Sequence, residues 1–314
     1  MEVSEVSRTA EAPSRHYRTW TLDSRRWESW RPREGDIVIA TYPKCGTTWM
    51  QRIVSLLIFR SSDPLPLMDI SPWIDKRFGE PLDVVIGRIE AQGHRRFLKS
   101  HLPLDGLPLH PGVKYIHVAR DGRDACMSYH NHAMGLTETV REHFDRIGLE
   151  DETIARPFPR VPEDPADYFH RWVRNDNVPH LPFLDFERSW WNGRARENVL
   201  HVHYNDLKAG LGAEMRRIAS FLGASIPEGE WATLVDAASF DSMRKQGDAL
   251  LAATGKIFKE GGERFFFKGS NERWRGVFRD DDLAAYESSC ASLLEPACAR
   301  WLAGGRGSGD PRAP

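Results

Sequence analysis

One short turn, residues 42–49, holds the residues with the clearest capacity for chemistry, in the order YPKCGTTW. Gly46 lets the backbone approach a ligand, and Lys44 supplies a positive charge. Thr47 and Thr48 add hydroxyl donors. The turn falls between an apolar β-branched run and a helical pattern, where backbone N–H groups and the helix dipole favour an anion. The pattern therefore predicts a phosphate site, although a polar cap on a plain strand-to-helix turn would use similar residues.

The order of residues in this turn differs from that of a nucleotide-triphosphate loop. Such loops place a lysine directly after the last glycine, followed by serine or threonine. Here Gly46 is followed by two threonines, and Lys44 stands before the glycine. A metal-bridged triphosphate is therefore not the ligand that we expect.

A second group of reactive residues, Lys99 and His101 in the segment KSHLP, comes at the end of an apolar run. The carboxyl ends of strands in an α/β sheet are where ligands usually bind, so a histidine at this point can act on a substrate. Histidine titrates near neutral pH, but in such a place it is often a structural hydrogen-bonding residue. The residues alone leave both roles open.

A third group begins at Arg120 in the segment IHVARDGRDACMS, with Ser128 two helical turns later. An arginine at the carboxyl end of a strand is shaped for bidentate contact with a phosphate, to which Ser128 can add a hydroxyl. Arg120 can equally pair with Asp121 or Asp124 in its own segment. Phosphate binding and a local ion pair are both consistent with this pattern.

These three groups must be positioned by a framework of alternating strands and helices. Apolar, β-branched runs predict the strands, and apolar residues at helical spacing predict the helices. The predicted strands cover residues 36–41, 96–99, 114–119 and 198–204, and the predicted helices cover residues 49–59, 206–222, 228–237 and 280–301. The alternation indicates one α/β domain on a mainly parallel, doubly wound sheet, with helices on both faces and a P-loop-like strand, turn and helix.

The domain limits follow from the same patterns. We expect residues 1–30 to form an N-terminal lead-in, residues 31–302 to form the domain, and residues 303–314 to form a flexible tail. Residues 61–73 and 135–165 are expected to be long connections, the second containing one helix. Connections of this length often carry substrate contacts.

Composition excludes several classes of protein. The chain of 314 residues carries 43 lysines and arginines against 45 aspartates and glutamates, so its formal net charge is -2. Such a balance gives no global attraction to nucleic acid or to a membrane surface. The N-terminal residues lack a signal-like apolar run, and no stretch reaches the roughly 20 apolar residues of a membrane span. We therefore expect a cytoplasmic protein without a nucleic-acid or membrane partner.

The four cysteines, at positions 45, 126, 290 and 298, form no CxxC pair and share no metal-ligand spacing with histidine. They are expected to be reduced thiols, and no metal site is predicted. One hypothesis concerns Cys45, because a thiol beside Lys44 at a helix N-terminus can have a lowered pKa and be open to oxidation. The alternative is that Cys45 is simply a small residue of suitable size.

The segments YPKCGTTW, KSHLP and IHVARDGRDACMS together resemble the cytosolic sulfotransferase family, in a bacterial-like form, with Cys45 where the family usually has serine. The resemblance runs from about residue 30 to residue 301. It implies transfer of a sulfuryl group from 3′-phosphoadenosine 5′-phosphosulfate to a hydroxyl of a small acceptor. Adenosine 3′,5′-bisphosphate would be the second product, and no metal ion would be needed.

The resemblance also implies roles for individual residues. It makes His101 the catalytic base, Lys44 the cation that neutralises charge on the bridging oxygen, and Lys99 the contact to the sulfuryl oxygens. The remaining nucleotide contacts that it implies are to the 5′-phosphate (Cys45, Gly46, Thr47, Thr48), to the 3′-phosphate (Arg120, Ser128) and to the adenine nucleotide (Trp49, Tyr204, Ser239, Phe240, Met243).

Two departures from the family pattern lie near the C-terminus. The family's 3′-phosphate loop, of the type RKGxxGDW, is matched here by Lys268 and Gly269, but Phe267 stands where the family has arginine. Arg264 or Arg273 would have to compensate. The family's dimer motif, which should begin at residue 275, lacks its Thr-Val pair and its glutamate. We therefore expect a monomer or a weak dimer.

The acceptor is expected to bind among the loops 64–78 and 132–172. Their aromatic residues favour a small aromatic or hydrophobic acceptor, and a carbohydrate or an amine stays open (Trp73, Phe78, Phe144, Phe158, Tyr168, Phe169). Two other functions remain as alternatives. One is a P-loop phosphotransferase such as a small-molecule kinase, and the other is a nucleotide binder that has lost catalysis.

Overall fold

A four-stranded parallel sheet forms the centre of the protein, in the strand order β2-β1-β3-β4. The computed structural model describes residues 10–175, 177–251, 257–259 and 265–312. The strands are β1 (Ile37–Thr41), β2 (Phe97–Ser100), β3 (Lys114–Ala119) and β4 (Val199–His203). All four predicted strands are confirmed within one residue at each end. The last predicted strand residue, Tyr204, instead begins a helix.

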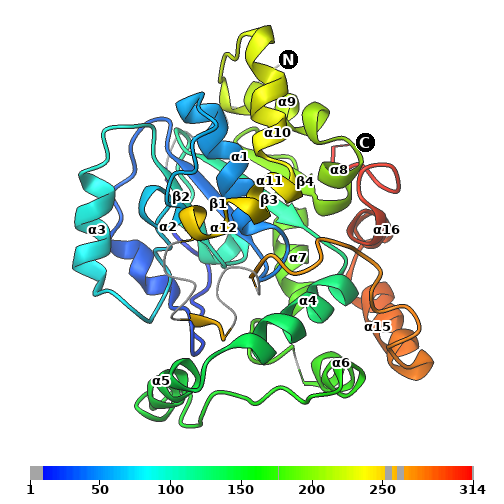
Figure 1. Ribbon diagram of the computed structural model, residues 1–314. Helices are drawn as coiled ribbons and strands as arrows, with labels where there is room; N and C mark the ends of the chain where they lie inside the picture. The colour runs from blue at the N-terminus through cyan, green and yellow to red at the C-terminus, as the bar shows by residue number, and fades with distance from the viewer. Residues whose placement is uncertain (1–9, 176, 252–256, 260–264, 313–314) are drawn as a thin grey trace, which may run out of the picture.

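The strands are almost entirely buried because helices cover both faces of the sheet (Figure 1). In β1, Ile37 and Ile39 belong to one hydrophobic cluster, whereas Val38 and Ala40 belong to the other. A parallel sheet buried in this way has continuous apolar strands instead of alternating ones. The predicted doubly wound α/β architecture is confirmed.

The helices divide between the two faces according to the cluster that their apolar residues join. The first face is covered by α1 (Thr47–Phe59), α8 (Tyr204–Ala209), α9 (Leu211–Leu222) and α10 (Trp231–Ala237), the last preceded by the 3-10 turn η3 (Glu228–Glu230). The second face is covered by α3 (Leu82–Glu90), α4 (Gly122–Gly135), α6 (Pro165–Arg174), α7 (Phe183–Asn192), α15 (Asp280–Leu293) and α16 (Pro296–Gly304), with the 3-10 turns η1 (Ser24–Ser29) and η2 (Leu104–Gly106).

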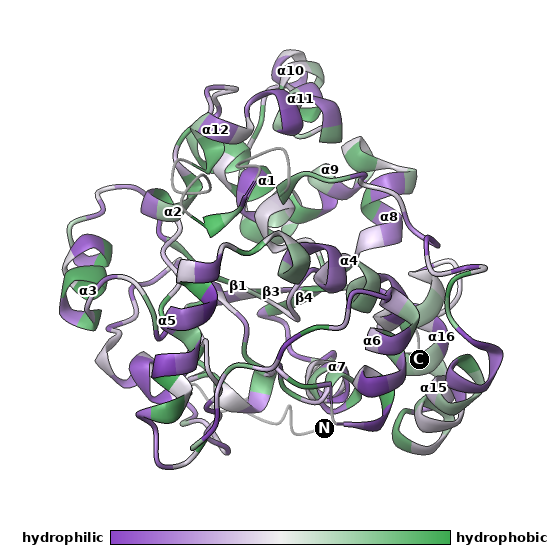
Figure 2. Cartoon of the chain, turned by 60° about the horizontal axis from the view of Figure 1, so that its bottom comes forward, coloured by the Kyte–Doolittle hydropathy of each residue, from purple (hydrophilic) through white to green (hydrophobic). Residues whose placement is uncertain are grey.

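Four further helices enclose the space beyond the carboxyl ends of the strands: α2 (Leu67–Ile70), α5 (Glu138–Leu149), α11 (Phe240–Lys245) and α12 (Gly247–Leu250). In Figure 2, α3 and α5 carry both hydrophilic and hydrophobic residues, as helices that cover a core do. Within the described ranges, none of the helices is long and apolar enough to cross a membrane.

Several predicted helices are divided in the structure. The helix predicted over 206–222 breaks at Gly210, and the one predicted over 280–301 breaks before Pro296. Glycine has a low helix propensity, and proline excludes the preceding residue from helical conformation. The stretch predicted as a loop over 61–73 contains the single turn α2.

The last helix, α16, continues to Gly304, three residues beyond the predicted helix end at residue 301. Beyond it, the Arg306 backbone N–H donates to Asp206 at 3.2 Å, and the Arg312 side chain donates to the Val199 carbonyl at 3.0 Å. These contacts join the described part of the tail to β4 and α8. The flexibility expected for residues 303–314 stays a prediction.

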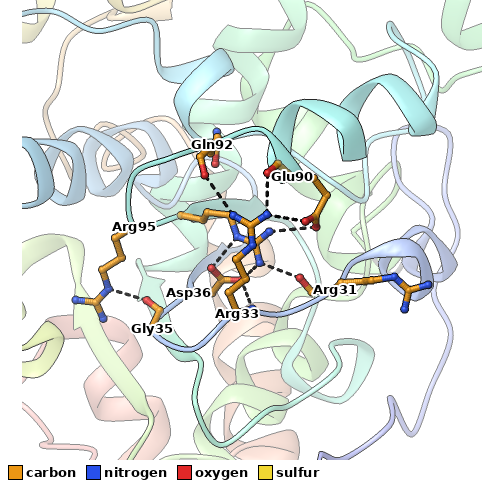
Figure 3. Close-up of polar contacts among 8 residues, drawn as sticks. Arg31, Arg33, Gly35, Asp36, Glu90, Gln92 and Arg95 are labelled. Carbon is orange, nitrogen blue, oxygen red and sulfur yellow. Dashed lines mark hydrogen bonds and ion pairs between the residues drawn. The ribbon is translucent and has the colours of Figure 1, made fainter.

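A buried ion pair ties the starts of β1 and β2 together. Arg96, only 1% exposed, donates from Nε to Asp36, which is 2% exposed, at 2.8 Å, and its Nη1 contacts Glu90 at 3.1 Å. Arg33 also reaches Glu90, and the Arg95 side chain donates to the Gly35 carbonyl at 2.6 Å. Figure 3 shows Asp36 and Glu90 at the centre of this network. The network fixes the end of the sheet opposite the site described below.

Removal of Arg96 should therefore cost far more stability than removal of a surface arginine in the same network. The change Arg96→Met leaves Asp36 buried without its counter-charge, and we expect it to lower the free energy of unfolding by about 3–5 kcal/mol. The matched control Arg33→Met removes the half-exposed partner of Glu90 and should cost less than about 1 kcal/mol. Guanidinium denaturation of both variants measures the difference. Equal losses would show that the Asp36–Arg96 pair does not hold the sheet.

Candidate active site

The four strands end at the same edge of the sheet, and the reactive residues predicted from the sequence are gathered there. Residues 42–46 follow β1, His101 follows β2, Arg120 follows β3 and Tyr204 follows β4. The chain passes from one side of β1 to the other after β2, so β1 is the switch point where ligands bind in α/β sheets. A cavity of about 580 Å³ opens at this point and is lined by all four of these places.

The turn after β1 is built to receive an anion. Gly46 has φ +106° and caps α1, and a side chain on it would approach the Tyr204 ring to 3.1 Å, so the position requires glycine. The first backbone bond of the helix runs from the Met50 N–H to the Gly46 carbonyl at 2.9 Å. The N–H groups of Thr47 and Thr48 therefore have no acceptor within the helix. Together with the helix dipole they can bind a phosphate.

His101 is held as a neutral imidazole with one nitrogen available. Its Nδ1 donates to the Thr41 carbonyl at 2.8 Å, which leaves the lone pair on Nε2, and the side chain lines the cavity although the residue is only 8% exposed. Burial, followed by the positive charge of Lys99, holds the pKa of His101 well below its ordinary value. This geometry suits a general base at neutral pH.

Asp75, which the sequence analysis missed, holds the surroundings of this base. The buried carboxylate accepts the His101 backbone N–H at 3.1 Å and the Trp73 indole N–H at 2.6 Å. The Trp73 ring in turn packs edge-on against the imidazole, with 4.8 Å between the ring centroids. No local pattern in the sequence marks Asp75, because its partners Trp27 and His101 lie on other segments.

Positive charge dominates the cavity wall. Among the described lining residues there are six lysines and arginines and no aspartate or glutamate (Lys44, Lys76, Lys99, Arg120, Lys268, Arg273). Burial, with the neighbouring cations Arg120 and Lys99, lowers the pKa of Lys44 to about 7. Burial, with a smaller effect from Lys76, lowers the pKa of Lys99 to about 8. The site is therefore prepared for an anion of several charges.

The two lysines nearest the base have aromatic and neutral partners. The Lys44 ammonium contacts His132 Nδ1 at 3.3 Å and the face of Phe265 at 4.7 Å. The Lys99 ammonium lies 4.4 Å from the centre of the Trp73 ring. Such contacts hold a cation in place without neutralising it. The sequence predicts no role for His132. Its only local indication of one is its position one helical turn after Ser128.

Arg120 is fixed over the turn that follows β1. Its guanidinium donates to the Lys44 carbonyl at 3.1 Å and to Asn271 at 2.6 Å, and it lies 4.2 Å from the Tyr204 ring. The Nε atom is buried and has no partner among the described atoms. Neither Asp121 nor Asp124, the alternative partners in its own segment, forms an ion pair with Arg120 in the described structure. An anion near Arg120 would supply the missing acceptor.

Aromatic and apolar side chains line the cavity beside Arg120. Trp49 donates from its indole N–H to the Ala238 carbonyl at 2.8 Å and packs against Tyr204 at 5.2 Å. Phe240 and Met243 line the same region, and Ser128 also lines the cavity. Gly269 has φ +61°, and a side chain on it would lie 2.6 Å from Phe240. These surfaces could hold a flat ring beside the phosphate sites.

Phe267 stands where an arginine was expected, and a neighbouring cation can replace the missing positive charge. Phe267 is 36% exposed, and both Lys268 and Arg273 place their cations 5.2 Å from its ring. Arg273 lines the cavity beside Arg120. Arg264, the other candidate, lies outside the described residues.

Some site predictions are wrong in detail. Ser239 is not among the residues that line the cavity, and its hydroxyl caps α11 by accepting the Ser242 N–H at 3.2 Å, so its contact with the nucleotide stays a prediction. The Cys45 side chain is buried in the core, and burial raises the pKa of its thiol well above the ordinary value, so the hypothesis of a lowered pKa is wrong.

The aromatic residues predicted to surround the acceptor divide into two groups. Tyr168 and Phe169 pack in the core, whereas four others line the cavity (Trp73, Phe78, Phe144, Phe158).

No metal centre is found in the part of the chain that the structure describes. There, no group of three or more histidine, cysteine, aspartate or glutamate residues is arranged to hold a metal ion.

Comparison with known proteins places this chain among sulfotransferases. The model of the sulfotransferase domain matches residues 34–297. A glycolipid sulfotransferase of Mycobacterium tuberculosis is 34% identical, with 94% of this chain and 96% of that protein covered. Mouse sulfotransferase 1B1 is 28% identical, over 72% of this chain and 71% of that protein.

Solved structures show the same fold at lower identity. A retinol dehydratase crystallised with androsterone and the inactive cofactor PAP has a TM-score of 0.67 and 20% identity, covering 88% of this chain and 87% of its own. Mouse sulfotransferase SULT7A1, complexed with PAP, has a TM-score of 0.65 and 19% identity, covering 88% of this chain and 90% of its own.

The lowered lysine pKa values predict proton uptake when an anion binds. In the free protein Lys44, with a pKa of about 7, is largely uncharged at pH 8. A bound phosphate favours the ammonium and raises this pKa. Binding of adenosine 3′,5′-bisphosphate at pH 8 should therefore take up protons, and its affinity should fall as pH rises from 6 to 9.

Calorimetry in buffers of different ionisation enthalpy measures this uptake. The matched variant Lys44→Arg keeps its charge over the whole range, so it should take up fewer protons and lose less affinity at high pH. Proton uptake that is the same in both proteins would contradict the assignment to Lys44.

Proposed function

Since this chain belongs to the sulfotransferase family, we propose that it transfers a sulfuryl group from 3′-phosphoadenosine 5′-phosphosulfate to a hydroxyl group on an acceptor with an apolar body, with His101 as the base. The observation that carries the proposal is the His101 imidazole, whose Nδ1 is bonded to the Thr41 carbonyl and whose lowered pKa leaves Nε2 without a proton at neutral pH. It lines a cavity whose described wall holds cations and no carboxylate.

The residues present fit the sulfuryl donor, which is a polyanion with a purine ring. The free N–H groups at the start of α1 and the hydroxyl of Thr48 would hold its 5′-phosphate. Arg120, with its unpartnered Nε, and Ser128 would hold the 3′-phosphate, assisted by Lys268, Gly269 and Arg273. The adenine would lie among Trp49, Tyr204, Phe240 and Met243. Backbone and hydroxyl donors would thus meet the 5′-phosphate, and protein cations would meet the 3′-phosphate.

The chemistry can be divided between the donor and the protein. The donor supplies an activated sulfuryl group when bound. His101 Nε2 takes the proton of the acceptor hydroxyl, and the Thr41 carbonyl stabilises the imidazolium that results by accepting from Nδ1–H. Lys44 and Lys99 line the same cavity as the base, where they would stabilise negative charge. Since sulfuryl transfer resembles phosphoryl transfer, positioning and charge stabilisation are the main tasks of the protein.

The apolar part of the cavity supports a hydrophobic acceptor. Phe78 packs against Trp73 at 5.6 Å and against Phe144 at 5.0 Å, and Phe144 packs against Phe158 at 5.0 Å. These rings begin beside His101, and the ammonium groups of Lys99 and Lys76 lie over the rings of Trp73 and Phe78. The relative in Mycobacterium tuberculosis is a glycolipid sulfotransferase by name, and an acceptor with an apolar body agrees with that name. We propose an aromatic or lipid-like alcohol as the acceptor.

The sequence left two alternative functions open, a small-molecule kinase and a nucleotide binder without catalysis. Family membership excludes a small-molecule kinase. A nucleotide binder without catalysis would have no need for a buried, oriented imidazole beside two desolvated lysines, so we favour an active enzyme. We further propose that the protein is cytoplasmic and acts as a monomer or weak dimer on a small-molecule acceptor, with residues 31–302 as its catalytic domain.

Replacing the base should separate catalysis from binding. We expect His101→Ala to lower kcat by about 10²- to 10⁴-fold, because the acceptor hydroxyl loses its proton acceptor. Affinity for adenosine 3′,5′-bisphosphate should stay within about twofold. Transfer of labelled sulfate and calorimetry measure the two quantities. A kcat within tenfold of the unchanged protein would remove His101 from the role of base.

The acceptor proposal is tested by sulfate transfer to a panel of matched alcohols. We expect the highest kcat/KM for phenols, steroids, long-chain alcohols and glycolipids, and the lowest for free sugars, which bury no apolar surface in the cavity. The His101→Ala variant is the control for each compound. Equal kcat/KM for free glucose and for the glycolipids would contradict an apolar acceptor site.

A further inference from the structure

Lys76 is a cation in the acceptor part of the cavity that the proposed mechanism does not use. It follows Asp75 directly, is half-buried, and lines the cavity together with Trp73 and Phe78. Its ammonium lies 5.4 Å from the centre of the Phe78 ring. Within the described ranges no carboxylate forms an ion pair with it. Lys76 therefore places a positive charge against the apolar wall that we assign to the acceptor.

The carboxylates around Lys76 are already committed to other partners. Asp75 is buried and accepts from Trp27, Trp73 and the backbone of His101. Asp151 pairs with Arg18 and Arg77, and Glu80 pairs with Arg88. Glu80 attracts Lys76 from a distance, but burial outweighs that attraction and lowers the pKa of Lys76. The positive charge is thus left partly desolvated without a counter-charge of its own.

A short series of ring contacts joins Lys76 to the base. The His101 imidazole packs against Trp73 at 4.8 Å, Trp73 packs against Phe78 at 5.6 Å, and Lys76 lies over Phe78. Two aromatic rings therefore separate the ammonium from the imidazole. One ligand can cover both rings and meet a polar group at each end. A desolvated cation at the end of an apolar wall is a typical recognition group for an anion.

We propose that the acceptor carries an oxyanion, as a carboxylate, sulfate or phosphate group, which Lys76 binds while the acceptor hydroxyl meets His101. This inference rests on the proposed function and adds the charge of the acceptor to it. The acceptor is then an amphipathic hydroxy acid or acidic lipid whose apolar part lies along Trp73 and Phe78. Lys76 determines specificity and takes no part in the chemistry.

Binding of matched compound pairs tests the proposal independently of turnover. We would saturate the protein with adenosine 3′,5′-bisphosphate and measure by calorimetry the affinity of 4-hydroxyphenylacetate, its sulfate and phosphate analogues, and the neutral 4-hydroxyphenylacetamide. A hydroxy fatty acid and its amide form a second pair. The anionic member should bind at least tenfold more tightly, and Lys76→Met should remove this preference while leaving the affinity of the amide within about twofold.

The control variant is Lys114→Met, which removes another lysine over a phenylalanine ring, 5.0 Å from Phe221, at the opposite end of the sheet. It should keep the full anion preference. An equal affinity for both members of each pair in the unchanged protein, or a preference that survives Lys76→Met, would overturn the proposal. If the preference depends on Lys76 but no compound accepts sulfate, the proposed function fails while the anion site stands.

Discussion

The central constraint on this structure is the concentration of positive charge in a partly dry cavity. The chain as a whole has a formal net charge of -2, yet the described wall of the cavity holds six cationic residues and no acidic one. Charges of one sign resist being brought together and desolvated, and the lowered pKa values of Lys44 and Lys99 are the direct result. The free energy that stabilises the fold must therefore come from elsewhere. It comes from the apolar clusters on the two faces of the sheet and from the Asp36–Arg96 pair at its far end.

The parallel sheet is what brings these groups together. Ala40 of β1 pairs in register with Ser100 of β2, so the next residues, Thr41 and His101, meet at the edge, where the Thr41 carbonyl orients the imidazole. The same strand β1 continues into the anion-binding turn. A shift of the register by one residue would turn every side chain of a strand to the opposite face. The base and the phosphate turn are thus positioned by one hydrogen-bonded ladder.

Much of this arrangement could be predicted from the sequence because its signals are local. Each strand contains neighbouring apolar residues, and the turn at residues 42–49 carries its own glycine, lysine and threonines. Asp75 and Asn271 could not be found in this way, since the partners that give them a role, His101 and Arg120, are distant in the chain. Aromatic content did not separate Phe78, which lines the cavity, from Phe169, which packs in the core. Ser239 was assigned to the ligand, although a serine before a helix is also a common cap.

The claim that most of this account depends on is that His101 is neutral and bears its proton on Nδ1. Nitrogen NMR of the imidazoles, with His101→Asn to assign the signal, tests it directly. We predict that Nε2 is unprotonated and Nδ1 protonated at pH 6.5, where an ordinary histidine is half charged, since burial holds the pKa of His101 well below that value. A His101 that is an imidazolium at pH 7, or that carries its proton on Nε2, would contradict its role as the base.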